Sequence, residues 1–327
     1  MGILRLSSGF LRVARRSSSM ILVVLVVGIL LTVLTPHFLR VDNILNMLTN
    51  ASVVAVVGLG MTLAIASGNF DLSVGSNAAF SSCVAFSLVP MLGIPLAILA
   101  GIITGALVGL CNGLIITELR VSAFITTLGM MTIVRGLALI YTKGQDLYLF
   151  GATGFKVLSG RPLLGIPTPM IIVLLLTLLL VATVKYTPFG RRILAIGSNA
   201  AVAKRSGIRV NIVTWGVFAL VGATAALSGL IVSAQVLTAN GRLDTGLELQ
   251  AIAVVVIGGT SLLGGQATLV GTLLGSVLVA MINNGLNLLN VPDSYQLLTV
   301  GLLLLIAVLI EVSRGYNLRQ ILKVGRN

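Results

Sequence analysis

Long apolar runs separated by short polar connections dominate the pattern along the chain. About ten of these runs approach the roughly 20 residues that a membrane-spanning helix needs. The pattern therefore predicts an all-α, polytopic membrane protein, with a transmembrane domain over residues 20–313 between terminal segments 1–19 and 314–327. The expected helices cover residues 20–35, 51–67, 72–89, 95–117, 122–141, 168–184, 212–236, 250–263, 269–289 and 295–312.

The expected helix at 250–263 is the shortest, and its neighbourhood is rich in glycine. Gly258, Gly259, Gly264 and Gly265 fit a segment that enters and leaves the membrane on one side as well as they fit a spanning helix. The sequence leaves both alternatives open.

Composition excludes a water-soluble fold, because 57% of residues are hydrophobic and only 9% are charged. The net charge of +13 comes from basic residues scattered through short connections, which indicates membrane topology rather than nucleic-acid binding. With both termini in the cytoplasm, 15 of the 21 Lys and Arg residues fall in inside segments and five fall outside. We therefore expect a multi-pass protein of the inner membrane with N- and C-termini inside.

Residues 187–209 form the longest polar and basic interruption, and we expect this segment in the cytoplasm. Pro188 and Gly190 are predicted to end the preceding helix, and residues 200–206 are predicted to form one short surface helix. A solvated loop that only fixes the topology is the alternative interpretation.

An internal echo links the two halves of the chain. Asn112-Gly113-Leu114 recurs as Asn284-Gly285-Leu286, and Thr127 and Gly129 recur as Thr299 and Gly301, all 172 residues later. The echo predicts an inverted repeat of two halves, as in many transporters, with chance agreement as the alternative. A glycine stripe at positions 101, 105, 109 and 113 is expected to pack within one protomer rather than across a dimer.

Polar side chains at membrane depth are the candidates for a translocation pathway, because each is costly there unless it is paired or hydrated. Structural bracing is the competing explanation for any one of them, and Arg135 could contact a solute, a carboxylate such as Glu248, or a backbone carbonyl. Amides outnumber charges, which favours an uncharged, hydroxylated solute. The candidates are Asn69, Asp71, Asn112, Arg135, Gln235, Glu248 and Asn284, with Asn283 and Asn287 beside the last of these.

Catalytic signatures are missing from the sequence. It has no GxxxxGK[ST] phosphate loop, no metal-ligand cluster and no Ser-His-Asp set. We therefore expect no enzyme activity, no cofactor and no metal, so that energy comes from a partner chain or an ion gradient.

Four segments carry a resemblance to a known family. Residues 67–76 (SGNFDLSVGS), 109–138, 187–208 and 247–265 resemble the ribose-type permease subunits of bacterial ABC sugar importers. The resemblance implies a homodimer with a cytoplasmic ATPase, a periplasmic sugar-binding protein and a pentose or hexose cargo of ribose or allose type. Asn69 and Phe70 depart from the family's usual GGIDLSVG, which leaves the sugar open.

The resemblance also makes the 187–209 segment the coupling element for the ATPase. It implies a helix at 199–207 that seats in the ATPase, so that Ala203→Arg would uncouple transport. The residues expected at this contact are Gly190, Arg191, Arg192, Asn199, Ala203 and Gly207.

Three alternatives stay open from the sequence. One is an ABC permease for a branched-chain amino acid or nucleoside, and another is a gradient-driven sugar transporter using Asp71 or Glu248. The third is a channel-like or purely structural membrane subunit.

Overall fold

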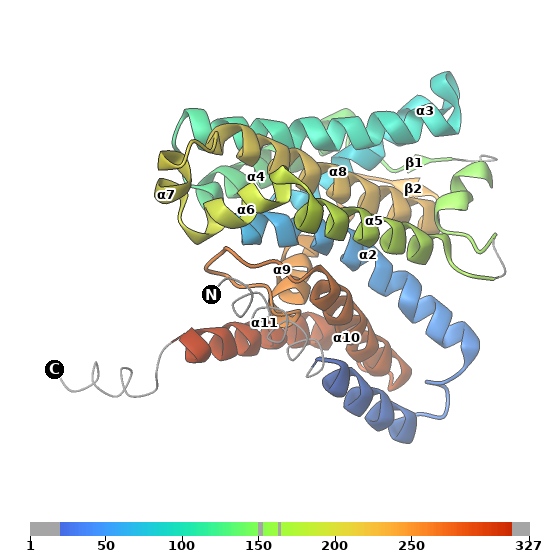
Figure 1. Cartoon of the computed structure of the whole chain (residues 1–327). Helices are drawn as coiled ribbons and strands as arrows, with labels where there is room; N and C mark the ends of the chain where they lie inside the picture. Colours follow the sequence, from blue (N-terminus) through green and yellow to red (C-terminus); the bar gives the residue numbers. More distant parts are fainter. Residues whose placement is uncertain (1–19, 150–152, 163–164, 316–327) are drawn as a thin grey trace.

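The computed structural model describes residues 20–149, 153–162 and 165–315 (Figure 1). The predicted terminal segment 1–19 and residues 316–327 of the predicted tail lie outside the described residues. A helix at Met20–Leu34 comes first. It is followed by α2 (Val41–Ala66), α3 (Val74–Glu118), α4 (Ala123–Tyr141), β1 (Leu147–Tyr148), η1 (Thr153–Leu158), α5 (Thr168–Tyr186), α6 (Pro188–Ser198), α7 (Ala200–Arg205), α8 (Val210–Val236), β2 (Thr238–Ala239), α9 (Leu247–Ile257), α10 (Leu269–Leu288) and α11 (Asp293–Gly315).

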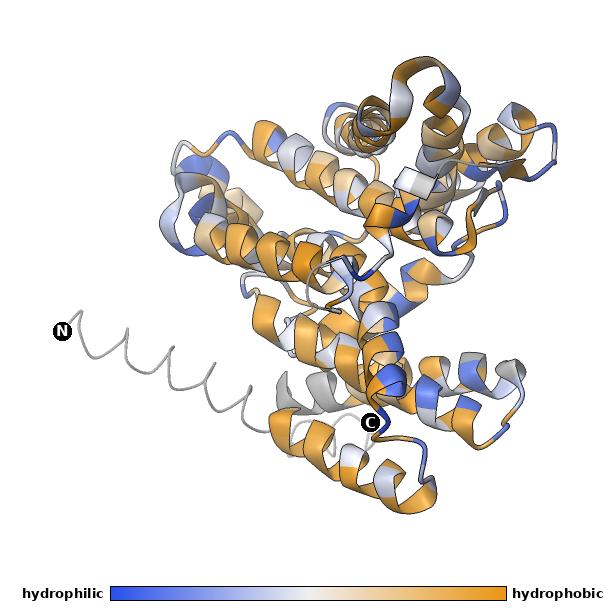
Figure 2. Ribbon diagram, turned by 90° about the vertical axis from the view of Figure 1, so that its right-hand side faces the viewer, coloured by the Kyte–Doolittle hydropathy of each residue, from blue (hydrophilic) through white to orange (hydrophobic). Residues whose placement is uncertain are grey.

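The all-α, polytopic prediction is confirmed at this level, but the count of about ten spanning helices is not. Six helices of the described chain are long and apolar enough to cross a membrane, namely α2, α3, α4, α5, α8 and α10. Orange hydrophobic positions cover most of their turns in Figure 2, while blue hydrophilic positions concentrate in connections and at some places along the helices.

The predicted helix at 250–263 is wrong in its extent. α9 has 11 residues, about 17 Å at 1.5 Å per residue, which is little more than half of a hydrocarbon core about 30 Å thick. Helical structure ends at Ile257, and Gly259, Gly264 and Gly265 then adopt positive φ. These glycines let the chain turn back on itself before α10 begins.

The long element α3 is a hairpin of two helices. Gly93 breaks it with φ 73° and ψ 168°, between Pro90 and Pro95. The halves run antiparallel, since the Asn77 amide donates to the Gly105 carbonyl oxygen at 3.0 Å. The two halves match the separate helices expected at 72–89 and 95–117.

The glycine stripe of α3 packs against α8 of the same chain. A Cβ on Gly109 would collide with the carbonyl oxygen of Phe218, and one on Gly105 would lie 2.5 Å from the Gly222 carbonyl oxygen. Backbone contact at this distance requires glycine at the α3 positions, and Gly222 adds a glycine on the α8 side of this α3–α8 seam. The expectation of packing within one protomer is therefore confirmed for this stripe.

The 172-residue echo extends to the order of the helices. Shifting α2 by 172 residues gives 213–238, which overlaps α8, and shifting α4 gives 295–313, which overlaps α11. The two halves of α3 overlap α9 and α10 after the same shift. The order of the helices in the two halves therefore corresponds at this offset, with α9 as the shortest counterpart.

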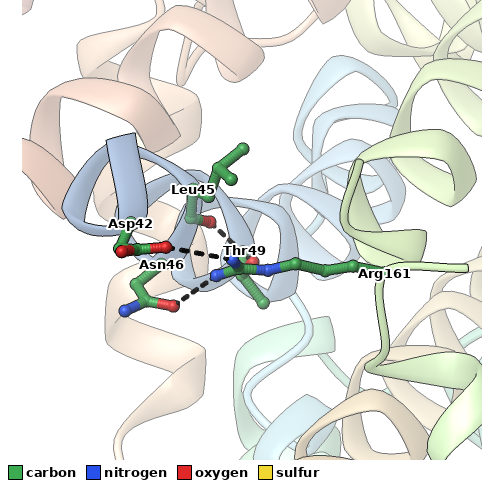
Figure 3. Close-up of polar contacts among 5 residues, drawn as sticks. All are labelled: Asp42, Leu45, Asn46, Thr49 and Arg161. Atoms are coloured by element: carbon green, nitrogen blue, oxygen red, sulfur yellow. Dashed lines mark hydrogen bonds and ion pairs between the residues drawn. The ribbon is translucent and has the colours of Figure 1, made fainter. Parts of the chain in front are cut away.

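The two ends of the molecule differ in their connections. β1 and β2 pair antiparallel at one end, whereas α6 and α7 lie at the other (Figure 1). Near the β1–β2 end, the Arg161 guanidinium reaches the first turns of α2, donating to the Asn46 side-chain oxygen at 2.7 Å and lying 3.7 Å from the Asp42 carboxylate (Figure 3). This contact ties the connection before α5 to α2.

Candidate translocation site

An amide-lined cavity of about 270 Å³ lies among α2, α8, α9, α10 and α11. Among the described residues that line it, none carries a charge. Its wall is completed by Val53, Val54, Val232, Val279 and Ala280, which give it apolar surface beside the amides. The amides are Asn50, Gln235, Gln250, Asn283, Asn284, Asn287 and Gln296.

The cavity lies in the half of the molecule near the β1–β2 end. Gln235 precedes β2 by three residues, and Asn50 lies in the part of α2 remote from Ala66, the residue that ends α2 near α6. The α10 amides occupy its last turns, far from the glycine-rich turn that precedes α10. The cavity therefore lies away from the α6–α7 end.

The cavity amides of α10 differ in their hydrogen bonds. Asn284 forms a reciprocal pair with Asn43 of α2, at 2.9 Å and 2.8 Å, and the Asn287 side-chain oxygen accepts from Gln296 at 2.6 Å. Asn283 has a buried Oδ1 without a hydrogen-bond partner. The three side chains thus line the same cavity but differ in whether their hydrogen-bonding groups have partners.

Asp71 and Asn112, both predicted for the pathway, are fully buried in a separate cluster. Asp71 Oδ1 accepts from the Ser73 backbone N–H at 2.9 Å and from the Ser73 hydroxyl at 2.6 Å. The Asn112 amide donates to Ser73 Oγ at 2.8 Å and lies 3.3 Å from Asp71 Oδ2. We call Asp71, Ser73 and Asn112 the Asp71 cluster, and its bonds join the start of α3 to its second half.

Asn69 also lies away from the cavity. Its side-chain amide donates to the Ser67 hydroxyl at 3.0 Å and to the Ser67 carbonyl oxygen at 3.3 Å. This local turn shapes the connection between α2 and α3.

Arg135 braces backbone carbonyls, as one of its sequence-based interpretations predicted. Its guanidinium donates to the carbonyl oxygens of Gly241 and Leu243, at 2.8 Å and 2.6 Å, so α4 holds the connection before α9. Asp244 and Glu248 lie within electrostatic range of Arg135. Each has one buried carboxylate oxygen without a hydrogen-bond partner. Neither Arg135 nor Glu248 lines the amide cavity.

At the α6–α7 end of the molecule, three segments meet through backbone contact. The Gly265 N–H donates to the Ala66 carbonyl oxygen at 2.8 Å, and a Cβ on Gly197 would collide with that same oxygen. A Cβ on Gly264 would lie 2.7 Å from the Gly197 carbonyl oxygen. The end of α2, the end of α6 and the turn after α9 therefore meet here with no side chains between them.

The basic segment at 187–209 contains two helices where the sequence predicted one. Pro188 does not simply follow a helix end, because it occupies the first turn of α6, where proline is favoured, and Thr187 accepts a hydrogen bond from the Gly190 N–H. Gly190 packs directly on the backbone of α5 at Val184. The second helix, α7, matches the predicted short helix.

Within α7, Asn199 caps the helix by accepting from the Val202 N–H at 3.0 Å, and Gly207 follows it with φ 81°. Ala203 is only 4% exposed, whereas Val202 is 56% exposed. The expected surface position of Ala203 is therefore wrong, because this face of α7 packs on the protein. Arg191 and Arg192, by contrast, are exposed.

Of the predicted pathway residues, the cavity gathers only Gln235 and Asn284, together with their neighbours Asn283 and Asn287. Sequence reasoning missed Asn50, Gln250 and Gln296. Asn50 fell outside the predicted bounds of its helix, and the other two stood at or near predicted helix starts. An amide within or beside an apolar run was the signal that could have found all three.

Comparison with known proteins gives a consistent result. A family described as the permease component of the branched-chain amino acid transport system matches residues 43–308. The ribose import permease protein of Escherichia coli K12 is 40% identical over 300 residues, covering 89% of this chain and 92% of that protein. The Bacillus subtilis ribose import permease is 42% identical over 285 residues, covering 86% and 88%.

A relative with another named sugar is also similar. The L-arabinose ABC transporter permease protein of Azospirillum brasilense is 34% identical over 308 residues, covering 94% of this chain and 90% of that protein. No solved structure matches the chain.

Proposed function

The chain belongs to this family of transport permeases, and from that membership we propose that it is the membrane-spanning subunit of an ABC importer for a monosaccharide of ribose type. The relatives named for ribose and arabinose support a pentose as cargo. The permease itself is a transport subunit and not an enzyme, so ATP hydrolysis falls to a partner chain.

The amide-lined cavity is the observation that carries the proposal. Pentoses are uncharged and offer several hydroxyl groups, each able to donate and accept hydrogen bonds with amides. Their C–H faces fit the valines that complete the wall. An amino acid would bring a carboxylate and an ammonium group, and the described lining offers no charge to pair with either.

A second copy of the permease would complete the site. Asn50, Gln235 and Asn287 line the cavity yet are exposed on the single chain. Amides facing hydrocarbon are costly because lipid chains cannot satisfy their hydrogen bonds. A homodimer that covers this face would keep the amides in a shared aqueous path between the copies.

The α6–α7 segment is the proposed seat of the ATPase, so this segment would lie in the cytoplasm, and we propose that both termini lie on the same side. Its basic side chains and the exposed Val202 offer an external contact, while Gly197 joins it to α2 and to the turn after α9. Movement of α6 would therefore reach two other segments of the chain through direct backbone contact. The opposite end would receive a sugar-binding protein.

Reconstitution tests the proposal. Proteoliposomes containing this chain, its ATPase and its binding protein are expected to accumulate radiolabelled ribose only with ATP on the ATPase side. Liposomes with the permease alone are the control and should accumulate none. ATP-independent accumulation by the permease alone, driven by an ion gradient, would contradict the proposal.

A further inference from the structure

Asn283 stands apart from the other amides that line the cavity on α10. Its Oδ1 is buried and accepts no hydrogen bond, although such an acceptor ordinarily finds a partner in a folded protein. Leaving a buried acceptor unsatisfied destabilises the folded state. The position therefore needs an explanation, and its place in the wall of a cavity suggests one.

The neighbouring amides show that α10 can satisfy such groups when their role is structural. Asn284, one position later, points to Asn43 and exchanges two hydrogen bonds with it. Asn287, one helical turn beyond Asn283, accepts from Gln296. Asn283 and Asn287 share a face of the helix, being four residues apart, but only Asn283 has its acceptor vacant.

The surroundings of Asn283 restrict what could fill the vacancy. The same cavity is lined by Gln235 of α8 and Gln250 of α9, while Val279 lies one turn earlier on α10. Because the described lining of this cavity carries no charge, an acceptor in its wall suits a neutral donor. A hydroxyl group is the simplest neutral donor that also has apolar carbon beside it.

We propose that Asn283 is a specificity-determining residue: its buried Oδ1 turns into the cavity when the side chain rotates, and there accepts a hydrogen bond from one hydroxyl group of the passing sugar. The proposal rests on the proposed function and adds a single contact to it. A site that hydrogen-bonds a substrate hydroxyl discriminates against the analogue lacking it, because the protein acceptor is then left unpaired. Asn284, already paired, would contribute to the packing of α10 on α2 and not to selectivity.

The experiment compares ribose with its monodeoxy analogues in the reconstituted, ATP-driven importer. Each sugar is loaded on the binding protein at saturation, so that differences in capture do not enter the rate. The wild-type complex is expected to carry one deoxy analogue about tenfold more slowly than ribose, the size of one lost hydrogen bond. Asn283→Leu should slow ribose by a similar factor and abolish the discrimination against that analogue.

Two variants provide the controls. Asn77→Leu, at a buried amide outside the cavity, is expected to lower the melting temperature of the purified complex while keeping the wild-type ratio between ribose and the analogue. Asn283→Ser, which keeps an acceptor on a shorter side chain, should retain part of the discrimination and serves if the leucine variant does not fold.

The outcomes separate the two proposals. If the wild type discriminates and both Asn283 variants discriminate equally well, the assignment of Asn283 is wrong and the sugar importer stands. If the wild type carries every deoxy analogue as fast as ribose, the assignment of Asn283 also fails. If the wild-type complex carries no pentose at all, the proposed function itself fails.

Discussion

The two copies of the repeat place equivalent asparagines in opposite environments. Asn112, in the first copy, is fully buried and bonded to Ser73 within the Asp71 cluster. Asn284, its counterpart 172 residues later, lines the cavity and pairs with Asn43. The same Asn-Gly-Leu sequence thus buries its asparagine in one half and exposes it to a cavity in the other. The repeated sequence predicts the path of the backbone but not the environment of the side chain.

Each half of the chain also contains a close backbone contact between helices, although the two contacts join different helix pairs. Gly109 meets α8 through backbone contact with Phe218, and Gly275 of α10 meets α9 through the Val254 carbonyl oxygen. Both contacts exclude a side chain. The two contacts do not occupy corresponding positions, so close helix packing in each half rests on its own glycines.

The largest expected effect comes from filling these glycine contacts. Gly109→Ala and Gly275→Ala should each destabilise the fold by about 3 kcal/mol, because a methyl group would push two helix backbones apart. Yield and melting temperature in detergent measure this. Gly129→Ala is the matched control, since nothing lies within 4 Å of its added carbon. Equal stability of Gly109→Ala and Gly129→Ala would contradict the close backbone packing of α3 on α8.

Breaking the Asp71 cluster should cost nearly as much. Asp71→Ala leaves the Ser73 N–H and the Ser73 hydroxyl without their acceptor, in a site with no exposure, while the Asn112 amide keeps Ser73 Oγ as its acceptor. We expect a loss of about 2–3 kcal/mol. The comparison is Asn284→Ala, which removes one side of an amide pair beside a cavity that water can enter, and should cost about 1 kcal/mol. Similar losses would mean that the two asparagines are equally structural.

Substitution of Arg135 tests whether this residue supports backbone carbonyls or contacts the solute. Arg135→Met leaves the Gly241 and Leu243 carbonyl oxygens without a donor and removes the positive charge near Asp244 and Glu248. A loss of about 2 kcal/mol is expected, with Arg135→Lys retaining part of the stability. Transport by the folded fraction should keep its preference among sugars. A changed preference would assign Arg135 to the pathway instead.

The smallest effect on folding is expected at α7. Val202→Arg places a charge on an exposed side chain, so the melting temperature should change little while ATP-driven uptake falls severalfold. Ala203→Arg, in contrast, should disturb the packing of α7, because Ala203 is buried. Measurements of uptake and of ATPase co-purification distinguish the Val202→Arg variant from the Ala203→Arg variant. Normal uptake by Val202→Arg would remove α7 from the ATPase contact.

Sequence alone determined the class of this protein and much of its backbone. Apolar runs of sufficient length fix the helices, because lipid leaves no other way to satisfy the backbone. The glycine spacing in α3 correctly predicted close packing within the protomer, and the 172-residue echo anticipated the order of the helices.

Only the tertiary structure decided which polar residues share a cavity. Asp71, Asn112 and Asn284 look equivalent along the chain, and their partners Ser73 and Asn43 separate them only once the helices are packed. The structure also divided the basic segment into α6 and α7 and shortened α9, since capping by Thr187 and backbone contact at Gly197 and Gly265 depend on neighbours remote in sequence. Apolar periodicity carries no information about such contacts, because a hydrogen bond is set by the distance between two atoms in the folded chain.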